Sequence, residues 1–208
     1  MNRTILTIIS FVIYSIGCTK QSIFSLSDQN KDQVIAIQPL DNFDVTEMAG
    51  IMNEISTLYR RRVIVLGSMK VPSTFFNTRI NMYSADSILR LVSTLQNDSI
   101  AEVIALTNHP IFAVRTSVHG WYYDEKIFGM GHQPGNACVI SDYRLKTSDK
   151  KILNYRLRNV ILHEVGHNLG LPHCREEVCI MSGKSGHFEN LNRPNKAYCK
   201  KCRKKSGS

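Results

Sequence analysis

Two features that would place this chain in a broad class are lacking from its 208 residues. Its first apolar stretch, from Ile5 to Ile16, is too short to cross a bilayer as a helix, which needs about 20 residues. Acidic residues are few, 17 against 26 lysines and arginines, and the formal net charge is +9. Much of that excess lies in residues 200–205, and no nucleic-acid recognition motif accompanies it. We therefore expect neither a membrane-spanning protein nor a partner of nucleic acid.

Cysteine is also sparse, with six residues in the whole chain. These are Cys18, Cys138, Cys174, Cys179, Cys199 and Cys202. If Cys18 is set aside as part of a leader, five remain, which excludes a framework of simple disulfide pairs. The last four form Cys-x4-Cys and Cys-x2-Cys pairs, a spacing that suits a tetrahedral zinc site or, in an oxidising compartment, two disulfides. We favour zinc, because a Cys-x2-Cys pair chelates one ion readily, and we expect Cys138 to be buried and unreactive.

The first eighteen residues have the pattern of a secretory signal: Arg3, an apolar stretch, then Gly17-Cys18. A cysteine directly after a small residue resembles a bacterial lipobox, although Ser15 occupies a position where leucine is usual. The alternatives are an ordinary cleaved signal and an uncleaved anchor. We expect an exported lipoprotein that is anchored to the membrane through Cys18, with residues 19–32 as a polar tether.

The remainder has the length and composition of one folded domain, with 43% hydrophobic and 21% charged residues. Apolar patterning predicts an α/β fold with a mixed, mostly parallel twisted sheet packed on helices. The expected strands are 34–37, 63–66, 100–107, 127–130 and 137–140. The expected helices are 44–59, opened by a capping box at Asp44 to Glu47, 84–95, capped by Ser84, and 150–169, started by Asp149 or a neighbour. We expect the strands 34–37 and 63–66 to be parallel, and the strands 127–130 and 137–140 to form a hairpin. The folded domain would cover residues 33–202, including a small C-terminal segment 174–202 that holds the four cysteines, and a basic tail would cover 203–208. We expect a monomer.

The most informative stretch runs from His163 to His173 and has the pattern His-Glu-x-x-His-x-x-Gly-x-x-His. On a helix, His163 and His167 lie one turn apart on the same face and can bind one metal. Gly170 can adopt the positive φ that ends the helix and turns the chain, so that His173 supplies a third nitrogen. Three protein ligands leave a fourth position open, as in catalytic zinc sites, and Glu164 is placed to polarise water. The alternative is three ordinary surface histidines.

This stretch and the residues after it resemble the signature of the archaemetzincins, a family of zinc metalloproteases in the metzincin clan. The resemblance extends beyond the three histidines to five later residues of the family's signature: Cys174, Cys179, Met181, Cys199 and Cys202. The segment 127–141, with Arg144-Leu145, is similar to the strands that precede the active-site helix in that family. The resemblance covers residues 33–202, most strongly over the last sixty.

The resemblance implies a zinc-dependent peptidase with two zinc ions per chain. His163, His167 and His173 would bind the catalytic zinc, and Glu164 would be the general base that activates the metal-bound water. Met181 would be the Met-turn residue beneath that zinc. The structural zinc would be bound by the four cysteines of the C-terminal segment: Cys174, Cys179, Cys199 and Cys202.

Several roles around the cleft stay open at this point. The strand 137–141 would be the sheet edge that receives a peptide substrate. His132 and His187 are either stabilisers of the transition state or exposed loop histidines, and Tyr143 and Tyr198 are equally open as oxyanion partners. A different class of function, a non-catalytic envelope lipoprotein that is stabilised by zinc and binds peptides, is the alternative to the peptidase.

Overall fold

The computed structural model describes residues 32–183, 188–194 and 196–207. The chain divides into two units, residues 1–30 and 31–208, and the first lies entirely outside the described residues. The expected leader, Cys18 and nearly all of the tether therefore lie outside the described residues. His187, further along the chain, also lies outside them. No helix in the described part combines the length and the apolar character that crossing a membrane requires.

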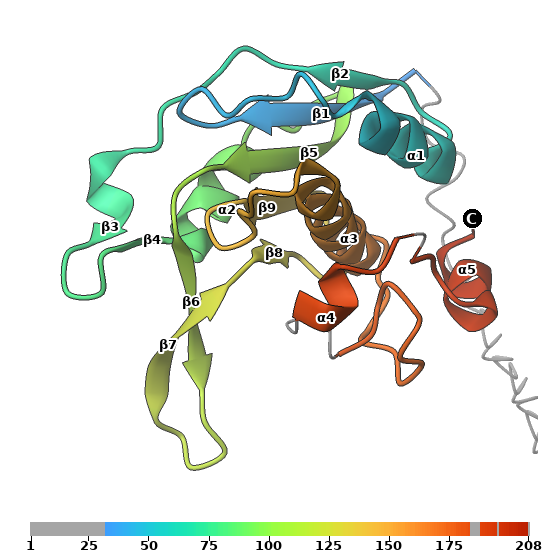
Figure 1. Ribbon diagram of the computed structural model, residues 1–208. Coiled ribbons are helices and arrows are strands. Elements are labelled where there is room, and N and C mark those ends of the chain that lie inside the picture. Colours follow the sequence, from blue (N-terminus) through green and yellow to red (C-terminus); the bar gives the residue numbers. More distant parts are fainter. Residues whose placement is uncertain (1–31, 184–187, 195, 208) are drawn as a thin grey trace, which may run out of the picture. The chain divides into compact units, whose positions relative to one another are not determined.

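A five-stranded sheet with the order β2-β1-β5-β9-β8 forms the centre of the fold (Figure 1). Its strands are β1 (Val34–Pro39), β2 (Val63–Val65), β5 (Ile100–Thr107), β8 (Gly129–Gly131) and β9 (Ala137–Ser141). The first four strands in this order are parallel, and β8 runs antiparallel to β9. The predicted fold class, the parallel pairing of the first two strands and the hairpin are thus confirmed.

One expectation about this sheet is wrong. The strand at the edge is β8, whereas β9, covering residues 137–141, is paired on both sides, with β5 and with β8. The sequence was misleading because β9 is buried along its whole length, and such an apolar run does not reveal whether a strand lies at the edge or in the interior of a sheet. The short strand β8 contains two glycines and gives little apolar signal.

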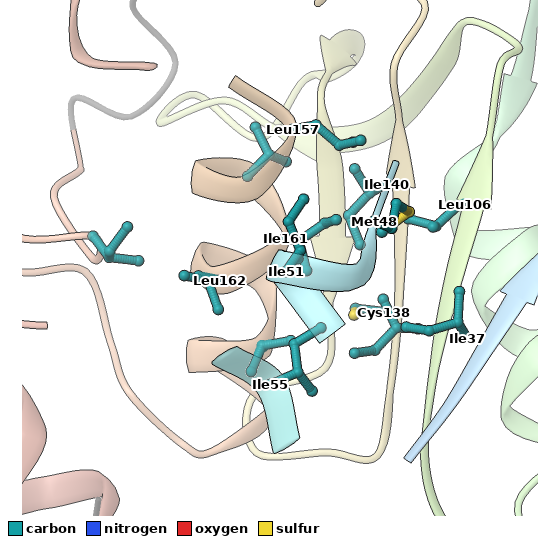
Figure 2. Close-up of a cluster of buried hydrophobic side chains, with 14 of the residues drawn as sticks. Ile37, Met48, Ile51, Ile55, Leu106, Cys138, Ile140, Leu157, Ile161 and Leu162 are labelled. Atoms are coloured by element: carbon teal, nitrogen blue, oxygen red, sulfur yellow. The ribbon is translucent and has the colours of Figure 1, made fainter. Parts of the chain in front are cut away.

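Helices cover both faces of the central sheet, as the alternation of side chains along the strands requires. On one face, Ile37, Leu106, Cys138 and Ile140 pack against α1 (Ala49–Tyr59) and α3 (Lys150–Asn168), as Figure 2 shows. On the other face, a second cluster packs against α2 (Ala85–Ser93) and contains Ala36, Val103, Ala105, Ala137 and Val139. Cys138 is completely buried, as expected.

Helix starts follow their capping residues in two of three cases. The side chain of Ser84 accepts from the amide of Ser87 at the start of α2, and Asp149 accepts from two amides at the start of α3. The third expectation, a capping box at Asp44, is wrong. Asp44 instead accepts from the amide of Thr46 in a local turn, and α1 begins five residues later at Ala49.

A second, four-stranded sheet with the order β3-β4-β6-β7 was not foreseen from the sequence. It contains β3 (Phe76–Asn77), β4 (Met82–Ser84), β6 (Ile111–Thr116) and β7 (Tyr122–Ile127), with the 3-10 turn Ser73–Phe75 before it. Figure 1 shows the β6–β7 hairpin extending away from the central sheet. The residues where β6 leads into β7 are exposed, including Trp121 at 76%, so the sequence there lacks the apolar alternation of a half-buried strand.

Among the residues that the structure describes after α3, two short helices form, α4 (Phe188–Leu191) and α5 (Lys200–Ser206). The basic residues expected as a tail are exposed on α5, while Cys202 on the same helix is buried. Isolated bridges join Cys174 to Ser182 and Cys179 to Ala197, and these hold the segment in place with almost no regular structure.

Candidate metal centre and active site

The three histidines of the motif converge at the end of α3. The ring centroids lie 4.7 Å apart for His163 and His167, 5.3 Å for His163 and His173, and 5.0 Å for His167 and His173. One ring nitrogen from each can be chosen so that all lie within 4.8 Å of one another. Gly170 has φ of 79°, and the turn that it makes brings His173 back to the helix.

Hydrogen bonds to the main chain orient two of these rings. Nδ1 of His163 donates to the Ile180 carbonyl at 2.8 Å, and Nδ1 of His167 donates to the Leu171 carbonyl at 2.9 Å. Each Nε2 is then left with a lone pair, and the two Nε2 atoms are 3.1 Å apart. Burial lowers the pKa of His163 to about 3, so its imidazole stays neutral. Facing lone pairs at this distance need a cation between them, and two nitrogens on one tetrahedral zinc would lie roughly 3.4 Å apart.

Glu164 lies beside this cluster and is 8% exposed. Burial raises the pKa of its carboxyl group to about 8, while the amide of Gly131 and the charge of Arg115 offset part of that rise. Glu164 therefore retains a proton at higher pH than an ordinary glutamate does. That proton affinity is near the operating range of a general acid–base catalyst.

Two glycines let the edge strand β8 lie directly against α3. A Cβ at Gly129 would be 2.8 Å from Cγ of Glu164, and a Cβ at Gly131 would be 2.9 Å from the carbonyl oxygen of Glu164. Any larger side chain would push the strand away from the helix. Neither role was predicted from the sequence, although a Gly-x-Gly pattern within a short strand signals such a close approach.

Met181 lies against α3 at Gly166 and is completely buried. Its sulfur fills the space beside Gly166, where a Cβ would be 2.2 Å from Sδ. The Met181 carbonyl also accepts a hydrogen bond from the amide of Cys174 at 2.6 Å. Met181 thus joins the helix that carries two histidines to the segment that carries the cysteines.

The four C-terminal cysteines form a second cluster, in which all Sγ atoms lie within 4.8 Å of one another. None of them is in a disulfide, and Sγ of Cys174 is 3.8 Å from Sγ of Cys199. The Cys199 amide donates to Sγ of Cys179 at 3.3 Å. The amide of Cys202 is the main cause that lowers the pKa of Cys199 to about 7, whereas burial raises the pKa of Cys179 and of Cys202. Four thiols in this arrangement are a donor set for zinc.

A cleft of about 680 Å³ opens beside the histidines and Glu164. Residues of β7 and β8 form another part of its wall, together with Phe128 and Arg144. Arg115, Lys126 and Gln133 also line the cleft and were not predicted from the sequence. Arg115 and Lys126 lie on β6 and β7 of the unforeseen second sheet, and Gln133 lies between β8 and β9.

The histidine and tyrosines that were left open do not line this cleft in the described part of the chain. The hydroxyl of Tyr198 is buried and donates to the Leu162 carbonyl at 2.6 Å. Tyr143 is 53% exposed, and neither it nor His132 is among the lining residues.

Comparisons with known proteins agree with this site. The model of peptidase family M54 matches residues 24–206. Archaemetzincin from Archaeoglobus fulgidus is 27% identical over 172 residues, which cover 82% of this chain and 97% of that protein. Archaemetzincin from Halobacterium salinarum is 26% identical over 161 residues, which cover 73% and 87% of the two chains.

Solved structures show the same fold. The crystal structure of archaemetzincin from Methanopyrus kandleri superposes with a TM-score of 0.69 at 22% identity, covering 85% of this chain and 94% of that one. The A. fulgidus archaemetzincin, in complex with malonate, gives a TM-score of 0.67 at 26% identity and covers 83% and 99%.

Proposed function

This chain belongs to peptidase family M54 and is a zinc-dependent metallopeptidase, and we propose specific roles for its residues. His163, His167 and His173 hold the catalytic zinc, because two Nε2 lone pairs face each other at 3.1 Å and the third ring closes the group. The carbonyls of Ile180 and Leu171 fix the tautomers in which Nε2 carries the lone pair that binds metal.

Zinc in this position would supply Lewis-acid chemistry, polarising the scissile carbonyl and making water acidic enough to react near neutral pH. Glu164 acts as the general base: its carboxylate takes a proton from the attacking water and returns it to the leaving amine. A raised pKa suits both steps, because the group must hold the proton between them. The walls contributed by Gly129 and Gly131 keep the carboxylate next to the substrate.

Peptide substrates would bind along β8. This strand pairs with β9 on one side only, and its residues line the cleft. An extended peptide can therefore add to its free edge as a further strand, using main-chain hydrogen bonds that do not depend on sequence.

The single observation that carries the mechanism is the position of buried Glu164 next to three converging histidines. Its test is Glu164→Gln, which preserves size but removes the proton acceptor. We expect kcat/KM for peptide hydrolysis to fall by about 10²–10⁴-fold, with zinc content unchanged. Glu47→Gln, on an exposed acid that pairs only with Lys150, is the control and should retain full activity. Equal activity in wild type and Glu164→Gln would refute the mechanism.

The alternative of a non-catalytic peptide-binding lipoprotein is not favoured, because the chain belongs to a peptidase family.

We further propose that the four C-terminal cysteines hold a second, structural zinc. Sulfur atoms on one tetrahedral zinc at about 2.3 Å would lie roughly 3.8 Å apart, and the Cys174–Cys199 distance is 3.8 Å. A disulfide requires about 2.0 Å. Metal analysis should give two zinc ions per chain for wild type and for Cys138→Ala, and one for Cys199→Ser. One zinc together with two disulfides by mass spectrometry would contradict the proposal.

The location of the protein is a separate proposal that rests on residues outside the described part. We propose export and lipid anchoring at Cys18, with the catalytic domain acting as a monomer. Membrane fractionation should show that Cys18→Ala moves the protein from the membrane to the soluble fraction, and unchanged partitioning would rule out the anchor. Size-exclusion chromatography of a chain without residues 1–18 tests the monomer.

A further inference from the structure

The cleft beside Glu164 carries more positive than negative charge. Three cations line it, Arg115, Lys126 and Arg144, against two acids, Glu125 and the buried Glu164. Nε of Arg115 donates to Glu125 at 2.8 Å, so these two charges neutralise each other. Among the ion pairs of the described residues, none contains Lys126 or Arg144. The wall therefore presents two uncompensated positive charges to whatever enters.

Arg144 is held in a defined position by contacts that leave most of its donors free. Its Nη1 donates to the Lys126 carbonyl at 2.8 Å, and its guanidinium carbon lies 4.5 Å from the centroid of the Phe128 ring. The Phe128 ring is in turn supported edge-on by Phe188, with centroids 5.5 Å apart. A guanidinium has five N–H donors in a fixed planar arrangement, which suits a carboxylate bound through two hydrogen bonds. Because the side chain is already ordered, binding costs less conformational entropy than it would for a free arginine.

The position of Arg144 relates it directly to the reaction. Phe128, on which it stacks, immediately precedes Gly129, and Gly129 contacts the side chain of Glu164. A peptide lying along β8 would thus pass the guanidinium within a residue or two of the bond that is cleaved. In contrast, nothing about main-chain pairing with β8 selects one side chain over another.

We propose that Arg144, assisted by Lys126, forms a subsite for a carboxylate of the substrate, and that acidic peptides are the preferred substrate class. The proposal rests on the peptidase function above and adds its specificity. The carboxylate comes either from an aspartate or glutamate side chain or from the free end of the peptide. Both present the same group to the guanidinium, and the experiment distinguishes them.

The test compares peptides that differ at one position at a time. A parent peptide is scanned with Glu, Gln and Lys on both sides of the scissile bond, each with a free and an amidated C-terminus, and kcat/KM is measured. For wild type we expect Glu to exceed Gln by about tenfold at one position, in line with a charge-assisted pair at a half-exposed site. If the C-terminal carboxylate of the peptide is the group that binds Arg144, amidation of that terminus should lower kcat/KM by the same factor instead. High salt should reduce the preference, since it screens exposed charges.

Substitutions test whether Arg144 causes the preference for acidic peptides. Arg144→Gln should make Glu and Gln substrates equal, and Arg144→Glu should favour Lys. Arg90→Gln removes one positive charge from α2, where Arg90 contacts Ser87, and should leave the preference unchanged. Thermal unfolding of each variant shows whether it is folded. Binding of the same peptides to Glu164→Gln, measured by calorimetry, gives a second readout in which the Glu peptide should bind about tenfold more tightly than the Gln peptide.

The proposal fails if wild type cleaves and binds charged and neutral peptides equally, or if Arg144→Gln keeps the preference. These results are distinct from a failure of the peptidase mechanism, which would appear as full activity in Glu164→Gln whatever the peptide.

Discussion

Glu102 offers a quantitative test of the packing behind the active-site helix. It lies on β5 and is 3% exposed, and Nδ2 of Asn168, the residue after His167, donates to its Oε1 at 2.7 Å. Burial raises the pKa of this carboxyl group from the ordinary 4.5 to about 7, and the nearby Tyr59 hydroxyl and Asn168 amide offset part of the rise. The charge that α3 rests against therefore depends on pH in the physiological range.

The sign of the effect follows from proton binding. The folded-state pKa of Glu102 is above its unfolded value, so between pH 4.5 and 7 the folded protein binds more protons than the unfolded chain. The free energy of unfolding consequently falls as pH rises through this window, and the loss is complete above about pH 7. The full loss corresponds to about 3 kcal/mol, of which about 2.5 kcal/mol develops between pH 5 and 8.

The substitution Glu102→Gln removes the titration but keeps an oxygen that can accept from Asn168. We expect the stability of the variant relative to wild type to rise by about 2.5 kcal/mol between pH 5 and 8, or roughly 5–10 °C in Tm. Urea unfolding of the metal-loaded proteins, followed by circular dichroism at several pH values, measures this difference. The zinc ligands are the same in both proteins, so their own pH dependence cancels.

Glu47→Gln, at a side chain 59% exposed, is the control and should give a curve parallel to wild type. If the Glu102→Gln curve is also parallel to wild type from pH 5 to 8, Glu102 does not titrate in that range and the reasoning from burial is refuted.

Two further substitutions test the packing around the histidines. Gly166→Ala places a Cβ 2.2 Å from Sδ of buried Met181, so we expect thermal unfolding to show a net loss of about 1–2 kcal/mol in stability. The control Gly50→Ala, with nothing within 4 Å of the added Cβ, should be neutral or stabilising. A Gly166→Ala protein as stable as wild type would mean that the Met181 side chain moves aside without cost. Tyr198→Phe removes the buried hydrogen bond to the Leu162 carbonyl, so stability should fall by about 1 kcal/mol while kcat/KM stays within about twofold of wild type. A large loss of kcat/KM would show instead that Tyr198 contacts the reacting atoms.

Features set by neighbours in the sequence were predicted well. Ser84 and Asp149 cap their helices with their own side chains, and the two histidines four residues apart share a face of α3 because the helix repeat requires it. Asp44 had an equally suitable side chain for capping a helix. It accepts from the Thr46 amide in a turn instead, and the helix begins only at Ala49. A local signal is thus sufficient only where the packing around it permits the same conformation.

Features set by distant contacts were not predicted. The hairpin of β8 and β9 was predicted, but nothing in residues 137–141 shows that β5 pairs with their other side, and the second sheet, with its exposed hairpin β6–β7, carries no apolar alternation. For the same reason the contributions of Arg115, Lys126 and Arg144 to the cleft went unrecognised. Arg115 and Lys126 are brought there by the pairing of β6 with β7, and Arg144 is held by its contact with the Phe128 ring.

The sequence by itself determined the chemistry of this protein: a helix with two histidines and a glutamate, a glycine that turns the chain, a third histidine and four cysteines at ligand spacing. Such ligands act through short, chain-local geometry, so their spacing is readable in one dimension. Only the tertiary structure decided which strand forms the edge of the cleft, which tyrosine is buried away from it and which arginine faces it. Those choices depend on pairing between segments far apart in the chain, where many alternatives share the same local pattern.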